Sequence, residues 1–111
     1  MPQLHVYHRN ELPDPLDSER KVAEGWPTRY IHVADVEARS VEEAYRLTNT
    51  VRRDWWRREE VTAVVETPIR STSVGDVVVT PDGPRLCSDI GWKDVWRLRQ
   101  NSHRMRERET Q

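Results

Sequence analysis

The feature that most constrains the fold is a run of three valines, residues 77–79, between two glycine-containing corners. The first corner contains Gly75, and the second is an Asp-Gly pair that ends at Gly83. β-Branched residues favour extended backbone, whereas glycine permits the backbone angles that tight turns require. The stretch therefore predicts an antiparallel hairpin with strands at 76–80 and 85–89.

Three further segments have strand patterns. Apolar and polar residues alternate over 3–8 and over 29–36, and 61–66 is rich in β-branched residues. In an uninterrupted strand 29–36, successive side chains point to opposite faces. We therefore expect His32 on one face and Asp35 on the other.

The clearest helix signal begins at Ser40, which forms a capping box with Glu43 and precedes apolar residues at helical spacing. This pattern predicts a helix over 41–50. Residues 17–25 suit a short helix or turn, and 51–60 suit either a continued helix or a charged loop. After Gly91, the residues Trp92, Val95 and Trp96 recur at helical spacing and predict a short helix that docks its indoles on the sheet.

Together these elements predict an α+β fold: a small, mostly antiparallel sheet of about five strands packed on one main helix, with a short C-terminal helix or tail. The chain has 111 residues, the length of one ordinary domain. We place that domain at residues 1–96 and a basic extension at 97–111. With no Phe and five Trp, the core must use indoles, and we expect Trp26, Trp92 and Trp96 in it.

Cysteine usage and the start of the chain indicate the compartment. A single cysteine excludes an intramolecular disulfide, which fits a reducing cytoplasm. The first residues lack a leader pattern, and no apolar run approaches the ~18 residues of a membrane helix. We expect a cytoplasmic protein with no membrane segment.

Several of these motifs also carry a family resemblance. They are the Leu-Thr-Asn end of the segment 40–49, the Arg-Ser-Thr-Ser-Val-Gly-Asp-Val run at 70–77 and the Gly-Trp pair at 91–92. In them the chain resembles a group of small uncharacterised bacterial proteins, often carried by phages, plasmids or planctomycete genomes. The hairpin is similar to that of YodL-like domains. The resemblance covers roughly residues 4–96 and implies a small α+β fold with no established activity.

The loop before the valine run is the first candidate binding site. Its hydroxyls and amides suit a phosphate or a carboxylate, with an arginine beside them. A tight strand entry at Gly75 would use the same residues for purely structural bonds, and we favour that interpretation. The candidate residues are Arg70, Ser71, Thr72, Ser73 and Asp76.

An aromatic pair flanked by arginines is the second candidate. Indoles stack on bases and guanidinium groups bind phosphates, but Asp54 and the two glutamates at 59–60 cancel much of the charge. In a chain without Phe, we expect at least one of the two indoles to belong to the core. The residues concerned are Arg52, Arg53, Trp55, Trp56, Arg57 and Arg58.

Histidines and the cysteine give weaker signals. His5, His8 and His32 would converge if their strands paired, and a further ligand would complete a metal site. Histidines at strand positions are more often packing residues, and no metal-ligand motif is present. We therefore expect no metal and no cofactor, and we expect Cys87 to be a buried, unreactive thiol.

The chain has no nucleophile–base pair, metal-ligand spacing or phosphate-loop glycine pattern. We therefore expect a non-enzymatic binding or adaptor module of accessory or mobile-element type. Its protein partner would contact the Arg70–Ser73 loop and the indole pair. The alternative is a nucleic-acid-binding protein that uses 52–58 and the basic tail, although a net charge of −1 gives that alternative no support.

Overall fold

The computed structural model describes residues 2–51 and 53–100. Its strands are β1 (Gln3–Arg9), β2 (Tyr30–Glu37), β3 (Val61–Ala63), β4 (Val77–Thr80), β5 (Gly83–Ser88) and β6 (Gly91–Asp94). Its helices are α1 (Glu19–Glu24), α2 (Val41–Thr48), the single 3₁₀ turn η1 (Trp55–Arg57) and a helical segment at 95–100.

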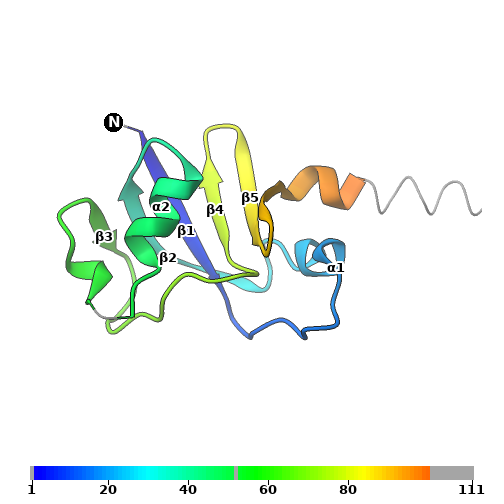
Figure 1. Cartoon of the computed structure of the whole chain (residues 1–111), viewed down its shortest axis with the longest axis horizontal. Helices are drawn as coiled ribbons and strands as arrows, with labels where there is room; N and C mark the ends of the chain where they lie inside the picture. Colours follow the sequence, from blue (N-terminus) through cyan, green and yellow to red (C-terminus); the bar gives the residue numbers. More distant parts are fainter. Residues whose placement is uncertain (1, 52, 101–111) are drawn as a thin grey trace, which may run out of the picture.

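The strands form one sheet in the order β3-β2-β1-β4-β5-β6, and every neighbouring pair is antiparallel. The two strands of the valine-run hairpin, β4 and β5, are thus inner strands, and β3 and β6 are the edges of the sheet (Figure 1). The expected α+β fold is confirmed, with six strands in the place of about five.

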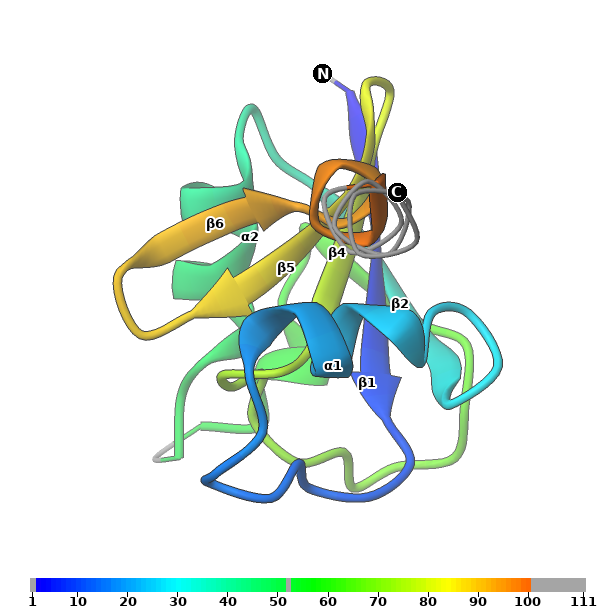
Figure 2. The ribbon, with the colours of Figure 1, turned by 90° about the vertical axis from the view of Figure 1, so that its right-hand side faces the viewer.

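Both faces of the sheet are covered, because alternate side chains of the valine run point to opposite sides. On one face Val78 joins a core cluster with Val6 and Trp55, and α2 packs on β1 and β4 (Figure 1). On the other face Val77 packs with residues of α1 and with Trp26. Figure 2 shows α1 below the β5–β6 hairpin.

A β-bulge interrupts the pairing of β1 with β2. Val6 lies opposite Ala34, but the next residue, Tyr7, lies opposite His32, so Val33 is an extra residue in β2. Cross-strand partners share a face of the sheet. The bulge therefore reverses the side on which His32 lies and overturns the expected separation of His32 from Asp35.

The C-terminal part departs most from the sequence prediction. Residues 91–94 are strand β6, where a helix was predicted. Gly91 has a φ of +123°, which turns the chain back along β5 and pairs Trp92 with Cys87. Helix begins only at residue 95. Trp26 is buried and Trp92 packs on the core as expected, but Trp96 is 46% exposed, so its predicted core position is wrong.

The boundaries of other elements differ by smaller amounts. Strand 61–66 is shortened to β3, and 51–60 holds η1 and turns in the described residues, not a continued helix. The helix that starts at residue 95 continues past residue 96, where we placed the end of the domain and the start of the basic extension. Leu98 packs on the core beside α1, and Arg99 Nη1 donates to the Trp26 carbonyl over 3.0 Å. The rest of the predicted basic tail lies outside the described residues.

Candidate functional site

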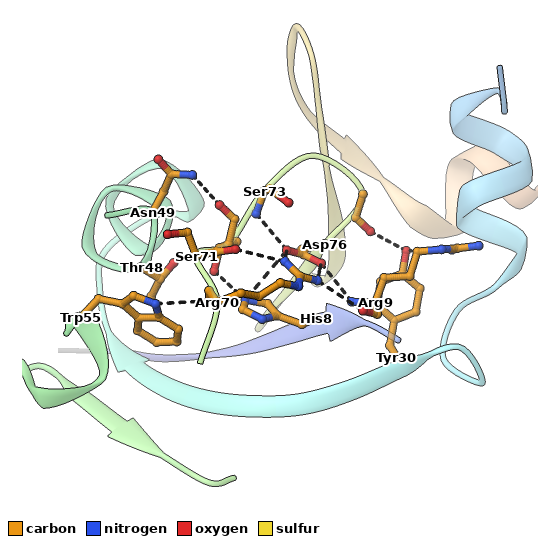
Figure 3. A network of polar contacts seen from close by, with 12 residues as sticks. His8, Arg9, Tyr30, Thr48, Asn49, Trp55, Arg70, Ser71, Ser73 and Asp76 are labelled. Carbon is orange, nitrogen blue, oxygen red and sulfur yellow. Dashed lines mark hydrogen bonds and ion pairs between the residues drawn. The ribbon is translucent and has the colours of Figure 1, made fainter. Parts of the chain in front are cut away.

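Asp76 is the centre of a buried polar network (Figure 3). Its side chain is 1% exposed and accepts two hydrogen bonds from the guanidinium of Arg70, both 2.7 Å long. It also accepts from the backbone N–H groups of Arg9, over 2.9 Å, and Ser73, over 2.8 Å. These four donors compensate the carboxylate for the water it loses on burial.

Two hydroxyl groups of the loop, those of Ser71 and Thr72, also have partners inside the chain. Ser71 Oγ donates to the Thr50 carbonyl over 2.9 Å, and Thr72 Oγ1 lies 2.8 Å from His8 Nε2. The Thr72 N–H donates to the carbonyl of Thr48, and the Asn49 side chain donates to the carbonyl of Thr72. The loop is therefore bound to the C-terminal end of α2.

This arrangement joins two motifs that are distant in the sequence, the Leu-Thr-Asn helix end and the loop before Gly75. Three of the donors that the sequence offered to an external phosphate or carboxylate bind inside the chain instead: the guanidinium of Arg70 and the hydroxyls of Ser71 and Thr72. Of the five candidate residues at 70–76, Thr72 and Asp76 are buried, and Arg70 has a side chain that is 38% exposed. Sequence analysis did not identify Asn49 and Thr48 as partners of this loop.

His8 belongs to the same network. Its ring is 5% exposed, 2.8 Å from Thr72 Oγ1 and 3.8 Å from Asp76 Oδ2. Burial lowers the pKa of His8 from 6.5 to about 4; the Asp76 charge opposes this shift and the Arg70 charge adds to it. His8 is therefore neutral at pH 7, and it lies on the α2 face of the sheet, away from His5 and His32.

The indole pair is only partly at the surface. Trp55 is fully buried and its Nε1–H donates to the Arg70 carbonyl over 3.2 Å. The expectation that at least one indole belongs to the core is thus confirmed. Trp56 is half-buried against Trp55, with ring centroids 5.9 Å apart. A nucleic-acid base could stack on this pair only at Trp56, because Trp55 is buried. Arg52 lies outside the described residues.

The remaining arginines of this segment face different surroundings. Arg53 is exposed, and Arg57 forms an exposed ion pair with Asp54 over 3.4 Å. Arg58 is half-buried, and its Nε has no hydrogen-bond partner among the described residues. These side chains do not form a common anion site with Arg70, whose guanidinium is bound to Asp76.

A pocket of about 400 Å³ lies where the segment after β1 meets the loop before β4 and the end of β5. Its lining is partly apolar, from Leu12, Val22, Val74 and Leu86 among others. Cys87 also lines it, and burial, with the charges of Asp76 and Asp89, raises the pKa of that thiol to about 11. The expected buried position of Cys87 is confirmed.

Carboxylates line the same pocket, and among its described lining residues there is no lysine, arginine or histidine. The acidic lining residues are Asp14, Asp17, Glu19 and Asp89. A neighbouring hollow of about 560 Å³ is lined by charges of both signs and offers less apolar surface. Sequence analysis assigned no element and no site to residues 12–15. The signal it missed was Leu12 and Leu16, large apolar residues placed among prolines.

Comparison of the chain with protein-family models, with curated proteins and with solved structures finds no match. The resemblance to YodL-like domains therefore stays a prediction. Within the described part of the chain, no helix has the length and apolar character needed to cross a membrane.

Proposed function

We propose that this protein is a non-enzymatic binding module whose acid-lined apolar pocket takes a basic and apolar segment of a partner protein. One observation carries the proposal. The pocket beside Leu12 combines apolar walls with four carboxylate side chains, and no basic side chain is among its described lining residues. One of the four, Asp17, pairs with Lys21 over 3.0 Å, and the other three remain to attract a basic partner. An apolar anchor residue gains free energy by burial, and lysines or arginines next to it would be attracted by the carboxylates.

The surface around the pocket supports this proposal. Leu12 is 76% exposed, Leu16 94% and Ile90 79%. Single exposed apolar residues are ordinary on proteins, but neighbouring ones that flank a concave site are typical of interaction surfaces. Leu12 and Val74 line the pocket, and Leu16 and Ile90 each adjoin a lining residue in sequence.

The polar loop shapes this site without binding the partner itself. Gly75 lines the pocket, and the Tyr30 hydroxyl donates to the Gly75 carbonyl over 2.7 Å. The network around Asp76 thus supports one wall of the pocket. The proposed contact surface is accordingly the pocket beside the loop, and not the side chains of Arg70 to Ser73. We also propose that the module is an accessory protein of the cytoplasm, where its single thiol would stay reduced.

The test measures binding of labelled short peptides to the full chain. The probes carry a leucine or methionine next to lysines or arginines, and the control peptides carry glutamates in place of the basic residues. Val74→Lys should weaken binding of the basic peptides about tenfold, a loss of about 1.4 kcal/mol. Val64→Lys is the matched control, because Val64 is 45% exposed, Val74 is 44% exposed and Val64 does not line the pocket.

Equal weakening by both substitutions would show a general effect of charge and overturn the proposal, as would equal binding of basic and acidic peptides. The same assay with single-stranded and duplex oligonucleotides tests the alternative function. Nucleic-acid binding through 52–58 would fall steeply with added salt and would be the same in Val74→Lys and Val64→Lys.

A further inference from the structure

A second cluster of functional side chains lies on the opposite face of the sheet from His8. His5 Nδ1 and His32 Nε2 each lie 2.6 Å from the same atom, Asp35 Oδ1. One potential ligand atom from each of the three side chains lies within 4.8 Å of the other two. Among the described residues, these side chains form the one group of three or more His, Cys, Asp or Glu that is arranged to hold a metal ion.

The β-bulge creates this cluster. His5 lies opposite Asp35 across the β1–β2 ladder, so these two side chains share a face. In a regular strand His32, three residues before Asp35, would point to the other face. The extra residue at Val33 places His32 opposite Tyr7, and Tyr7 shares a face with His5. The local irregularity thus gathers three ligand-type side chains that a regular sheet would separate.

The orientation of the rings suits a cation. The two imidazoles are perpendicular, with centroids 5.6 Å apart, and their nitrogens converge on one oxygen. Tyr7 stacks on His32 with centroids 4.9 Å apart and holds that ring in position. The side chains of His5, His32 and Asp35 are 42%, 34% and 20% exposed, so an ion can enter from solvent.

We propose that His5, His32 and Asp35 form a binding site for one divalent transition-metal ion, with zinc as its best probe. Two imidazoles and a carboxylate are a ligand set that zinc and related ions accept, at about 2.0–2.2 Å from each ligand atom. Small side-chain rotations bring the three atoms to such distances from a common centre. Three protein ligands leave a further coordination position for water or an external ligand.

Metal binding changes the tautomers of both rings. Without a metal, each ring donates an N–H to the carboxylate, since an ionised carboxylate can only accept. With a metal, the nitrogen that faces Asp35 supplies its lone pair, and the ring proton resides on the other nitrogen. The metal site shares no residue with the acid-lined apolar pocket, so either proposal can fail without the other.

The experiment uses the full, untagged chain after treatment with a chelator. Calorimetric titration with Zn²⁺, and Co²⁺ titration followed by visible absorption, should each show one equivalent bound per chain. His5→Gln, His32→Gln and Asp35→Asn should each weaken binding about tenfold or more. His103→Gln, which changes the one histidine outside the described residues, is the matched control and should leave the affinity unchanged.

A readout on the unaltered protein guards against misfolded variants. Paramagnetic Co²⁺ should broaden the ring resonances of His5 and His32 at substoichiometric concentration, and those of His8 later. Saturating Zn²⁺ should also raise the Tm of the unaltered chain but not of the three variants. If no saturable binding occurs, or if the three variants bind as tightly as the unaltered chain, the cluster is only a structural tie between β1 and β2 and the proposal is wrong.

Discussion

The guanidinium of Arg70 and the carboxylate of Asp76 form a two-point ion pair in which both N–O distances are 2.7 Å. Asp76 is 1% exposed, whereas the Arg70 side chain is 38% exposed. The arginine therefore closes the network from the solvent side. Since Asp76 also holds the backbone of Arg9 and Ser73, this pair fixes β1 to the loop that precedes β4.

Replacing the arginine should leave a buried, unpaired carboxylate. We predict that Arg70→Met lowers the free energy of unfolding by about 3 kcal/mol, as expected when one partner of a buried pair is removed. Arg57→Met is the control, because its ion pair with Asp54 is exposed and should contribute less than about 1 kcal/mol. Urea denaturation at pH 7 measures both. Equal losses in the two variants would contradict the structural role of the Arg70 pair.

The depressed pKa of His8 predicts a specific pH dependence. Below pH 6.5 the unfolded chain takes up a proton at His8, whereas the folded chain does so only near its pKa of about 4. The free energy of unfolding should therefore fall as the pH decreases from about 6.5 to about 4, by about 3 kcal/mol from this group. Above pH 6.5, His8 is neutral in both the folded and the unfolded chain, so its contribution to the free energy of unfolding no longer changes with pH.

Urea denaturation at several pH values between 4 and 7 measures this slope. His8→Gln keeps a polar side chain near Thr72 but cannot titrate. It should be less stable at pH 7 and should lose most of the pH dependence in this window. A variant with the slope of the unaltered chain would assign the dependence to other groups.

Gly75 combines a backbone constraint with the close approach of another side chain. Its φ is +96°, and a Cβ built on it would lie 2.9 Å from Cγ of Pro13. Gly75→Ala should lower the free energy of unfolding by about 1–3 kcal/mol. Gly91→Ala is the control for backbone strain alone, since Gly91 has a φ of +123° and nothing within 4 Å of a built Cβ.

The difference between the two glycine variants measures the contact with Pro13. The double variant with Pro13→Ala and Gly75→Ala should recover that difference in thermal denaturation, because the smaller side chain leaves room for the new methyl group. If the double variant is no more stable than Gly75→Ala, the loss of stability at Gly75 comes from its backbone angles alone.

The N-terminus of α2 depends on a short-range bond. Ser40 Oγ accepts from the Glu43 N–H over 3.1 Å, and this confirms the predicted start of the helix. Ser40→Ala should lower the free energy of unfolding by about 0.5–2 kcal/mol. Ser40→Asp, which retains an acceptor at the cap, should restore most of it. An unchanged denaturation curve for Ser40→Ala would show that tertiary packing alone holds the start of α2.

Local chemistry accounts for the elements that the sequence determined by itself. The Ser40 cap, the valine run and the Asp-Gly corner at Gly83 specify α2 and the β4–β5 hairpin, because their signals come from residues within a few positions of one another. The same short-range patterns predicted an α+β domain. Composition alone, namely the absence of Phe, predicted that one indole of the pair at 55–56 belongs to the core.

The tertiary structure decided which side chains meet. The bulge at Val33 depends on the pairing of β1 with β2, and it alone brings His32 to Asp35. The return of the chain at Gly91 made Trp92 a strand residue, because pairing with β5 outweighed its helical spacing. The pocket exists only because residues 12–17 pack on β5, far away in sequence. Contacts of this kind leave no local pattern, since their free energy comes from burial between distant segments.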